Sequence, residues 1–292
     1  MNRAMKTVLL TGGGGFFGTR FRTTFRHSFN IVSTDVAELD ILDREKVADA
    51  FNLIKPDYVI HAAAIALTGF CNENPDKCRE INVTGALNVG QAAKEHGARM
   101  IFLSSEQVFN GNGEAGPYSE TDTPAPDTVY GKNKLEAEGL LAELLDELVV
   151  LRFCWMFGVP ERGLPVVNNL LWDAVRSILS GKPVKASPNE YRGVTYVNDV
   201  VDRFDRIMDL DPGIYHVGSF TEKSRYDLAR HILVEMGLEA RIDELLIRDD
   251  EAYREHPRDA RLDTGKIGRA GIPFTESSEA ISRCIREYSL KV

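Results

Sequence analysis

The feature that most constrains the fold is a glycine-rich segment near the start of the chain, TVLLTGGGGFFGT, which runs from Thr7 to Thr19. A short apolar run of strand length, VLL, precedes the four glycines, and Phe16 and Phe17 follow them directly. A solvated linker would not be bracketed by apolar residues on both sides. The segment therefore predicts a buried strand, a tight turn and the first residues of a helix.

Short apolar runs alternate with longer helical segments over the first half of the chain. Strands are expected at residues 6–12, 29–35, 57–64, 98–106 and 148–154, and helices at 16–27, 43–56, 74–96 and 128–145. Such an alternation is typical of a parallel sheet that helices cover on both faces. It predicts an α/β fold with a doubly wound parallel sheet of the Rossmann type.

Within the first strand–turn–helix unit, the spacing Thr11-Gly12-x-x-Gly15-x-x-Gly18 indicates a dinucleotide-binding turn. Gly12 permits the tight turn, Gly15 lets the backbone approach a pyrophosphate, and Gly18 lets the helix pack closely on the sheet. The free N–H groups and the dipole of the helix N-terminus would stabilise the pyrophosphate. We interpret the segment as a phosphate-binding turn, with a glycine-rich turn that holds no ligand as the alternative.

Asp35 ends the second expected strand, where a carboxylate can accept hydrogen bonds from the hydroxyls of an adenosine ribose. Its negative charge would repel a 2′-phosphate, so NAD(H) is favoured and NADP(H) remains possible. The alternative is that Asp35 only caps the following turn, because Asp is a common turn residue.

The alternation weakens after Gly158, where prolines at positions 160, 165, 183 and 188 interrupt the chain. We therefore predict a Rossmann NAD(P)-binding domain at residues 1–158 and a smaller, mainly substrate-binding C-terminal domain at residues 159–292. One segment, at about 194–218, is expected to return to the first domain, because GIYHVGS has the pattern of a further strand.

Composition narrows the range of partners. The formal net charge is −9, from 44 acidic and 35 basic residues that are interspersed along the chain, so no footprint for nucleic acid or anionic membranes is expected. No apolar run approaches the length of a membrane span and no signal-peptide core is present, which predicts a cytoplasmic protein. The four cysteines make neither a disulfide framework nor a metal motif, and no metal site is expected.

A candidate acid lies in the segment YGKNKLEAE. Of nine tyrosines, Tyr130 alone has a lysine four positions on, Lys134, and on a helix this spacing puts both side chains on one face. The ammonium is expected to lower the tyrosine pKa from its ordinary value of about 10, which would make the phenol a usable proton donor and acceptor. LSSE ends the fourth expected strand, and strand C-termini are where such folds bind ligands.

Taken in order, TGGGGFFG, HAAA, INVTGALNV, SSEQVF and YGKNK resemble the extended short-chain dehydrogenase/reductase family. Within that family, residues 104–138 most resemble the dTDP-4-dehydrorhamnose reductases, whose equivalent segment reads Ser-Thr-Asp-Tyr-Val-Phe-Asp-Gly before a similar Pro-Tyr-x-Glu. The resemblance covers nearly the whole chain.

The resemblance implies a catalytic set of Ser105, Tyr130 and Lys134, with Asn82 of INVTG supporting the lysine, through water. A satisfied amide within a helix is the alternative for Asn82. The cofactor contacts that the resemblance implies are Gly12, Gly15, Phe16, Phe17, Gly18, Asp35, Ala62, Ala63, Ala64, Tyr130 and Lys134.

The resemblance also implies a nucleotide-sugar substrate in contact with Glu106, Trp155 and Arg192. Trp155 stands where many epimerases carry Asn, and Arg192 lies in a segment similar to one whose arginine contacts the substrate diphosphate in epimerases. The alternatives are a core aromatic for Trp155 and a solvated surface arginine for Arg192. Glu106 is followed by Gln107 rather than by the acidic pair of a dehydratase, which disfavours that activity.

Two departures leave the sugar and the nucleotide open. Residues 64–69, AIALTG, lack the tyrosine, threonine and aspartate of the reductases, and His256-Pro257 replaces their Arg-Pro. We predict an NAD(P)H-dependent reductase of a nucleotide-linked 4-keto-6-deoxysugar, with a homodimer as a possible assembly. The alternatives are a nucleotide-sugar 4-epimerase that keeps NAD bound, and a non-catalytic nucleotide-binding subunit such as the regulatory subunit of methionine adenosyltransferase.

Overall fold

The computed structural model describes residues 5–291 and has a six-stranded parallel sheet in the order β10-β5-β4-β3-β1-β2. The strands are β1 (Thr7–Thr11), β2 (Asn30–Thr34), β3 (Tyr58–His61), β4 (Arg99–Ser105), β5 (Leu148–Phe153) and β10 (Gly213–Val217). The predicted α/β fold with a doubly wound parallel sheet is confirmed. The strand order reverses at β1, which sets the C-terminal ends of β1 and β3 at the point where such sheets bind ligands.

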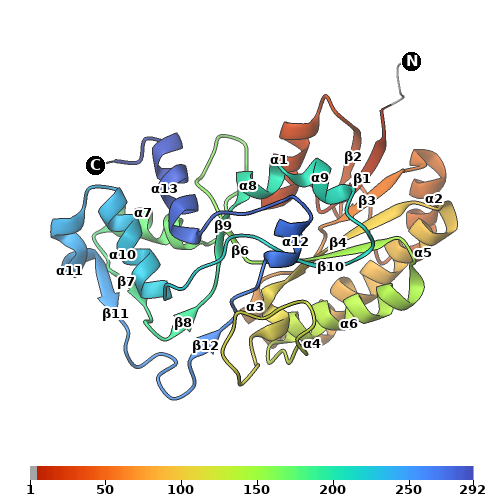
Figure 1. Ribbon diagram of the computed structural model, residues 1–292. Coiled ribbons are helices and arrows are strands. Elements are labelled where there is room, and N and C mark those ends of the chain that lie inside the picture. Colours follow the sequence, from red (N-terminus) through yellow and green to blue (C-terminus); the bar gives the residue numbers. More distant parts are fainter. Residues whose placement is uncertain (1–4, 292) are drawn as a thin grey trace.

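Helices cover both faces of this sheet (Figure 1). Alternate residues of each strand supply two cores, so that Leu9 packs with helices on one face while Val8 and Leu10 pack with helices on the other. The first set is α2 (Arg44–Ile54), α5 (Ala86–His96) and α6 (Val129–Leu144), and the second is α1 (Phe16–Phe25), α8 (Val197–Val201) and α9 (Phe204–Met208).

Side-chain caps fix where several helices begin. Asp43 accepts a hydrogen bond from the N–H of Lys46 at the start of α2, and Thr128 accepts one from the N–H of Gly131 at the start of α6. The cap at Thr128 sets the position of the first turn of α6, which carries Tyr130.

The segment after β3 differs in detail from the single helix expected at residues 74–96. It forms α3 (Thr68–Glu73), α4 (Pro75–Arg79), a π-helical segment (Glu80–Gly85) and then α5. The extra helix α3 was not predicted, because TGFCNE is too short to show a helical period.

The C-terminal half is built from helices and short strand pairs (Figure 1). Besides α8 and α9, its α-helices are α7 (Leu170–Ser180), α10 (Arg225–Glu235), α11 (Ile242–Leu245), α12 (Gly265–Arg269) and α13 (Ser277–Glu287). The paired strands are β6 (Trp155–Phe157) with β9 (Val194–Tyr196), β7 (Val184–Ala186) with β11 (Leu246–Arg248), and β8 (Glu190–Tyr191) with β12 (Arg258–Asp259).

From the predicted returning segment, β10 joins the main sheet beside β5, with Gly213 opposite Val149. The domain limits at residues 158 and 159 stay a prediction. Among residues 5–291, no helix combines the length and the apolar character that crossing a membrane requires.

Candidate active site

The glycine-rich turn joins β1 to α1 and packs against the backbone that follows β3. Gly12 has a φ of +70°, and a Cβ atom there would lie 2.7 Å from the backbone nitrogen of Ala63. A Cβ atom on Gly18 would lie 2.8 Å from the carbonyl oxygen of Gly12. Neither position can carry a side chain without moving backbone. Gly12 thus lets the turn lie close to Ala62 and Ala63, and Gly18 lets α1 lie close to the turn itself.

Asp35 directly follows β2 and faces this turn. One carboxylate oxygen accepts a hydrogen bond of 2.8 Å from the N–H of Gly14. The turn after β2 is closed by the backbone carbonyl of Asp35, which accepts from the N–H groups of Glu38 and Leu39. The side chain is therefore not used to cap the following turn, and its negative charge lies beside the glycines.

Ser105, Tyr130 and Lys134 meet at the C-terminal end of β4. Ser105 is the last residue of that strand, and Tyr130 and Lys134 lie one turn apart on α6. The Lys134 ammonium donates a 2.7 Å hydrogen bond to the carbonyl of Leu103 and lies 5.9 Å from the centre of the Tyr130 ring. All three side chains are buried.

The pKa values of this group run against one prediction. Burial raises the pKa of Tyr130 above its ordinary value, the charge of Glu106 adds to the rise, and a hydrogen bond with Ser105 opposes it. Burial also lowers the pKa of Lys134, to about 8. The net shift of the tyrosine pKa is therefore upward, opposite to the expected lowering, because desolvation outweighs the opposing hydrogen bond with Ser105. Tyr130 stays protonated at neutral pH, which is the form that donates a proton.

Asn82 lies in the π-helical segment, and its amide is occupied by the backbone of Ile65. Its Oδ1 atom accepts from the Ile65 N–H at 2.8 Å, and its Nδ2 atom donates to the Ile65 carbonyl at 3.0 Å. These contacts correspond to the alternative of a satisfied amide, and they clamp the chain that leaves β3. Support of Lys134 by Asn82 stays a prediction.

Glu106, Trp155 and Arg192 come together although they are far apart in the sequence. The Arg192 guanidinium donates to the Glu106 carboxylate, 86 residues away, and its carbon lies 4.5 Å from the centre of the Trp155 ring. The Arg192 side chain is only 12% exposed, so the alternative of a solvated surface arginine is wrong. Burial raises the pKa of Glu106, and the nearby Arg192 opposes this rise.

Glu106, Trp155 and Arg192 are surrounded by further charged residues, which no sequence motif indicated. The buried carboxylate of Glu190 contacts Arg225 at 3.0 Å, Arg258 at 3.6 Å and Arg192 at 3.9 Å. The arginines lie in three separate segments without a shared motif. Only Arg258 could have been found from the sequence, because it directly follows the His-Pro pair at 256–257, where the resemblance to the reductases places an Arg-Pro pair.

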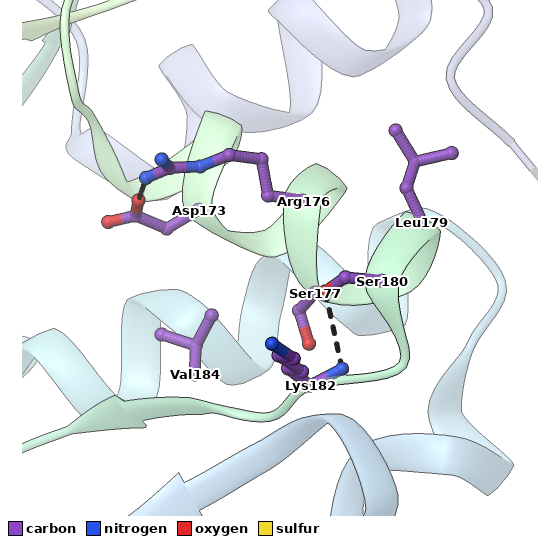
Figure 2. Close-up of a pocket in the computed structure, with 7 residues that line it drawn as sticks. All are labelled: Asp173, Arg176, Ser177, Leu179, Ser180, Lys182 and Val184. Atoms are coloured by element: carbon purple, nitrogen blue, oxygen red, sulfur yellow. Dashed lines mark hydrogen bonds and ion pairs between the residues drawn. The ribbon is translucent and has the colours of Figure 1, made fainter.

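Three hollows of the molecular surface are lined by other residues. One of them, of about 460 Å³, lies at the end of α7 and is lined by none of the predicted site residues. Figure 2 shows its lining residues, among which Asp173 pairs with Arg176. Within residues 5–291, no group of three or more His, Cys, Asp or Glu side chains could hold a metal ion. The convergence of side chains beyond β4 is thus the strongest candidate site.

Comparison with known proteins gives consistent matches over nearly the full chain. The family model of the RmlD substrate binding domain matches residues 5–290. The chain is 29% identical over 288 residues to the spore coat polysaccharide biosynthesis protein SpsK of Bacillus subtilis, with 98% of this chain and 99% of that protein covered. It is 28% identical over 301 residues to a dTDP-4-dehydrorhamnose reductase of Aggregatibacter actinomycetemcomitans, with 98% and 100% covered.

Among solved structures, the chain is similar to the dTDP-4-dehydrorhamnose reductase of Bacillus anthracis in complex with NADP. The TM-score is 0.85 at 23% identity, and the match covers 98% of this chain and 100% of that one. At this identity the likeness is evidence of a shared fold.

Proposed function

This chain belongs to the RmlD substrate binding domain family, and on that premise we propose that it is an NAD(P)H-dependent reductase of a nucleotide-linked 4-keto-6-deoxysugar. The observation that carries the proposal is the meeting of a buried Ser105–Tyr130–Lys134 group with Glu106 and Arg192 at one end of the sheet. The first group is suited to moving a proton, and the second brings Arg192 and the ring of Trp155 to the same place.

The residues of the glycine turn fit a dinucleotide. Gly15, which has no side chain that could cap the helix, precedes α1, and the first turn of α1 carries no acidic residue. The backbone N–H groups at this helix end are therefore suited to a pyrophosphate. Asp35 would hold the adenosine ribose, and Lys134 would hold the nicotinamide ribose. When bound, NAD(P)H supplies the hydride that reduces the ketone carbon.

The residues of this chain supply the proton and the orientation. The protonated Tyr130 phenol gives its proton to the ketone oxygen, which becomes a hydroxyl, while the Ser105 hydroxyl donates a hydrogen bond to the same oxygen. The flat ring of Trp155 suits the apolar face of a deoxysugar. The guanidinium fork of Arg192 suits a diphosphate, provided that its bond with Glu106 is shared or exchanged.

We expect NADH to bind more tightly than NADPH, because the Asp35 carboxylate would meet a 2′-phosphate with like charge. The Asp35→Ala variant should narrow the difference between the two dissociation constants. Fluorescence titrations of the wild-type and variant proteins with NADH and with NADPH measure these dissociation constants. A preference of the wild-type protein for NADPH would contradict the assignment.

The function is tested by mixing the protein with NADH and dTDP-4-dehydrorhamnose and following both cofactor and sugar. A reductase is expected to oxidise one NADH for each sugar reduced and to release NAD after each turnover. Sugar inversion without net loss of NADH would identify the epimerase instead. Cofactor binding without turnover over a panel of keto-sugars would favour the regulatory subunit.

A homodimer and a cytoplasmic location, both expected from the sequence, are kept as predictions. Sedimentation of the purified protein measures the first, and fractionation of the producing cells measures the second.

A further inference from the structure

A buried ion pair lies next to Lys134, in a position that the proposed chemistry does not use. Glu138 follows Lys134 by one turn of α6, and its partner Arg152 comes from β5; both side chains are only 3% exposed. Arg152 Nε donates to both carboxylate oxygens at 3.1 Å, and its Nη2 atom donates to one of them at 2.6 Å. The Ser104 hydroxyl also donates to the Glu138 carboxylate. Groups from β4 and β5 thus hold a carboxylate of α6 in one orientation.

Stability alone is a weak reason for such a pair. Removing two charges from water is costly, and replacing a buried ion pair by apolar residues is often neutral or stabilising. The Arg152 guanidinium also faces an aromatic ring, 5.2 Å from the centre of Phe109. An explanation for the charge of Glu138 should therefore be sought in what lies beside it.

What lies beside it is the Lys134 ammonium. The two residues are four apart on α6 and so share one helix face. Lys134 donates to the carbonyl of Leu103 and Glu138 accepts from the hydroxyl of Ser104, which is the next residue of β4. Burial lowers the pKa of Lys134 to about 8, and the Glu138 carboxylate acts in the opposite direction.

The other titratable groups around Lys134 do not supply a compensating charge. His61, from β3, has a pKa lowered to about 3 by burial and by the charge of Lys134, so it is neutral at working pH. Tyr130, on the same helix, stays protonated, and Glu106 acts on the pKa of that tyrosine. Arg152, from β5, carries a positive charge that is taken up by its bonds with Glu138.

We propose that Glu138 is a positioning residue of the active site, whose carboxylate, fixed by Arg152 and Ser104, keeps the Lys134 ammonium charged beside Tyr130. As a contribution to catalysis this rests on the proposed function, because Lys134 matters to turnover only if the protein is such an enzyme. As a statement about the charge of Lys134 it can be tested without any activity.

The direct test is an NMR titration of protein labelled with ¹⁵N-lysine, in which the Lys134 side-chain signal is identified by its loss in Lys134→Met. The Glu138→Gln variant is expected to lower the Lys134 pKa by about one unit or more, the range for loss of one close opposite charge. Glu136→Gln is the matched control, because Glu136 lies on the same helix and pairs with the exposed Arg79. An unchanged Lys134 pKa in Glu138→Gln overturns the proposal.

A double variant separates charge from folding. Glu138→Gln leaves Arg152 buried without its counter-charge and can unfold the protein, whereas Glu138→Gln with Arg152→Met removes both charges. The lowered Lys134 pKa is expected to persist in the double variant, because the carboxylate is still missing. A return to the wild-type value would assign the effect to Arg152 and overturn the proposal.

Turnover gives the second measurement. In Glu138→Gln the alkaline limb of the kcat/KM profile is expected to move to lower pH by the same shift as in the NMR titration, with Glu136→Gln unmoved. An alkaline limb that stays in place would overturn the role in catalysis. A wild-type protein without reductase activity would contradict the proposed function, while the titration would still decide the effect of Glu138 on Lys134.

Discussion

The Tyr130→Phe variant is expected to lose turnover by about two to four orders of magnitude, the range that general acid catalysis supplies. The substitution keeps the ring and removes the proton donor. The expectation is strengthened by the burial of Tyr130, which raises the pKa of its phenol and keeps the donor form filled at neutral pH. Steady-state kinetics with NADH and a nucleotide-linked 4-keto-6-deoxysugar measure the loss.

Two further measurements make this result specific. Cofactor affinity should change little in Tyr130→Phe, because the glycine turn and Asp35 are untouched. The matched control is Tyr58→Phe. Tyr58 is the first residue of β3, at the end of the strand opposite to the site, and its exposed hydroxyl donates a hydrogen bond to Asp209. Tyr58→Phe should leave turnover unchanged. Turnover of Tyr130→Phe within about tenfold of wild type would rule out the phenol as the acid.

Local patterns predicted most of the sheet. Each of β1 to β5 is an apolar run between helical segments, and these runs could be found one at a time. The end of β2 at Thr34 placed Asp35 at the rim of the sheet, and the structure brings its carboxylate to Gly14. Such features depend on neighbours in the sequence, which is why the sequence alone indicates them.

Features that depend on burial were predicted less well. The spacing of Tyr130 and Lys134 correctly put both on one helix, but the direction of the tyrosine pKa depends on how far both groups are removed from water. The spacing of residues along a helix does not show how deeply their side chains are buried. The same holds for Asn82, whose amide is occupied by Ile65, from a separate segment of the chain.

Features that join distant segments left no local signal. The strand pairs β7–β11 and β8–β12 consist of two or three residues on each side, too few for an alternating pattern. The ion pair of Glu138 with Arg152 joins residues 14 apart on different elements, and the sequence pattern around each indicates only a helix and a strand. The sequence shows the residue types, but the partner is set by the packing of α6 on the sheet.

This ion pair gives the largest stability effect that we expect. Arg152→Met removes one partner and leaves the Glu138 carboxylate buried with the Ser104 hydroxyl as its remaining donor. Breaking a buried pair in this way typically costs about 3–5 kcal/mol of unfolding free energy. Urea unfolding at neutral pH measures the cost, from the fall in the transition midpoint at an unchanged slope.

The matched control is Arg79→Met, which breaks the pair with Glu136 on the outer face of the same helix, where the two side chains are 55% and 34% exposed. That pair is screened by water and should contribute less than about 1 kcal/mol. If Arg152→Met lowered the unfolding free energy by no more than Arg79→Met, the pair of Glu138 with Arg152 would not contribute the expected stability. The double variant Glu138→Gln with Arg152→Met should recover most of the lost stability, because no unpaired charge remains buried. Recovered stability together with a lowered Lys134 pKa would mean that the fold can do without this ion pair, whereas the positive charge of Lys134 depends on the Glu138 carboxylate.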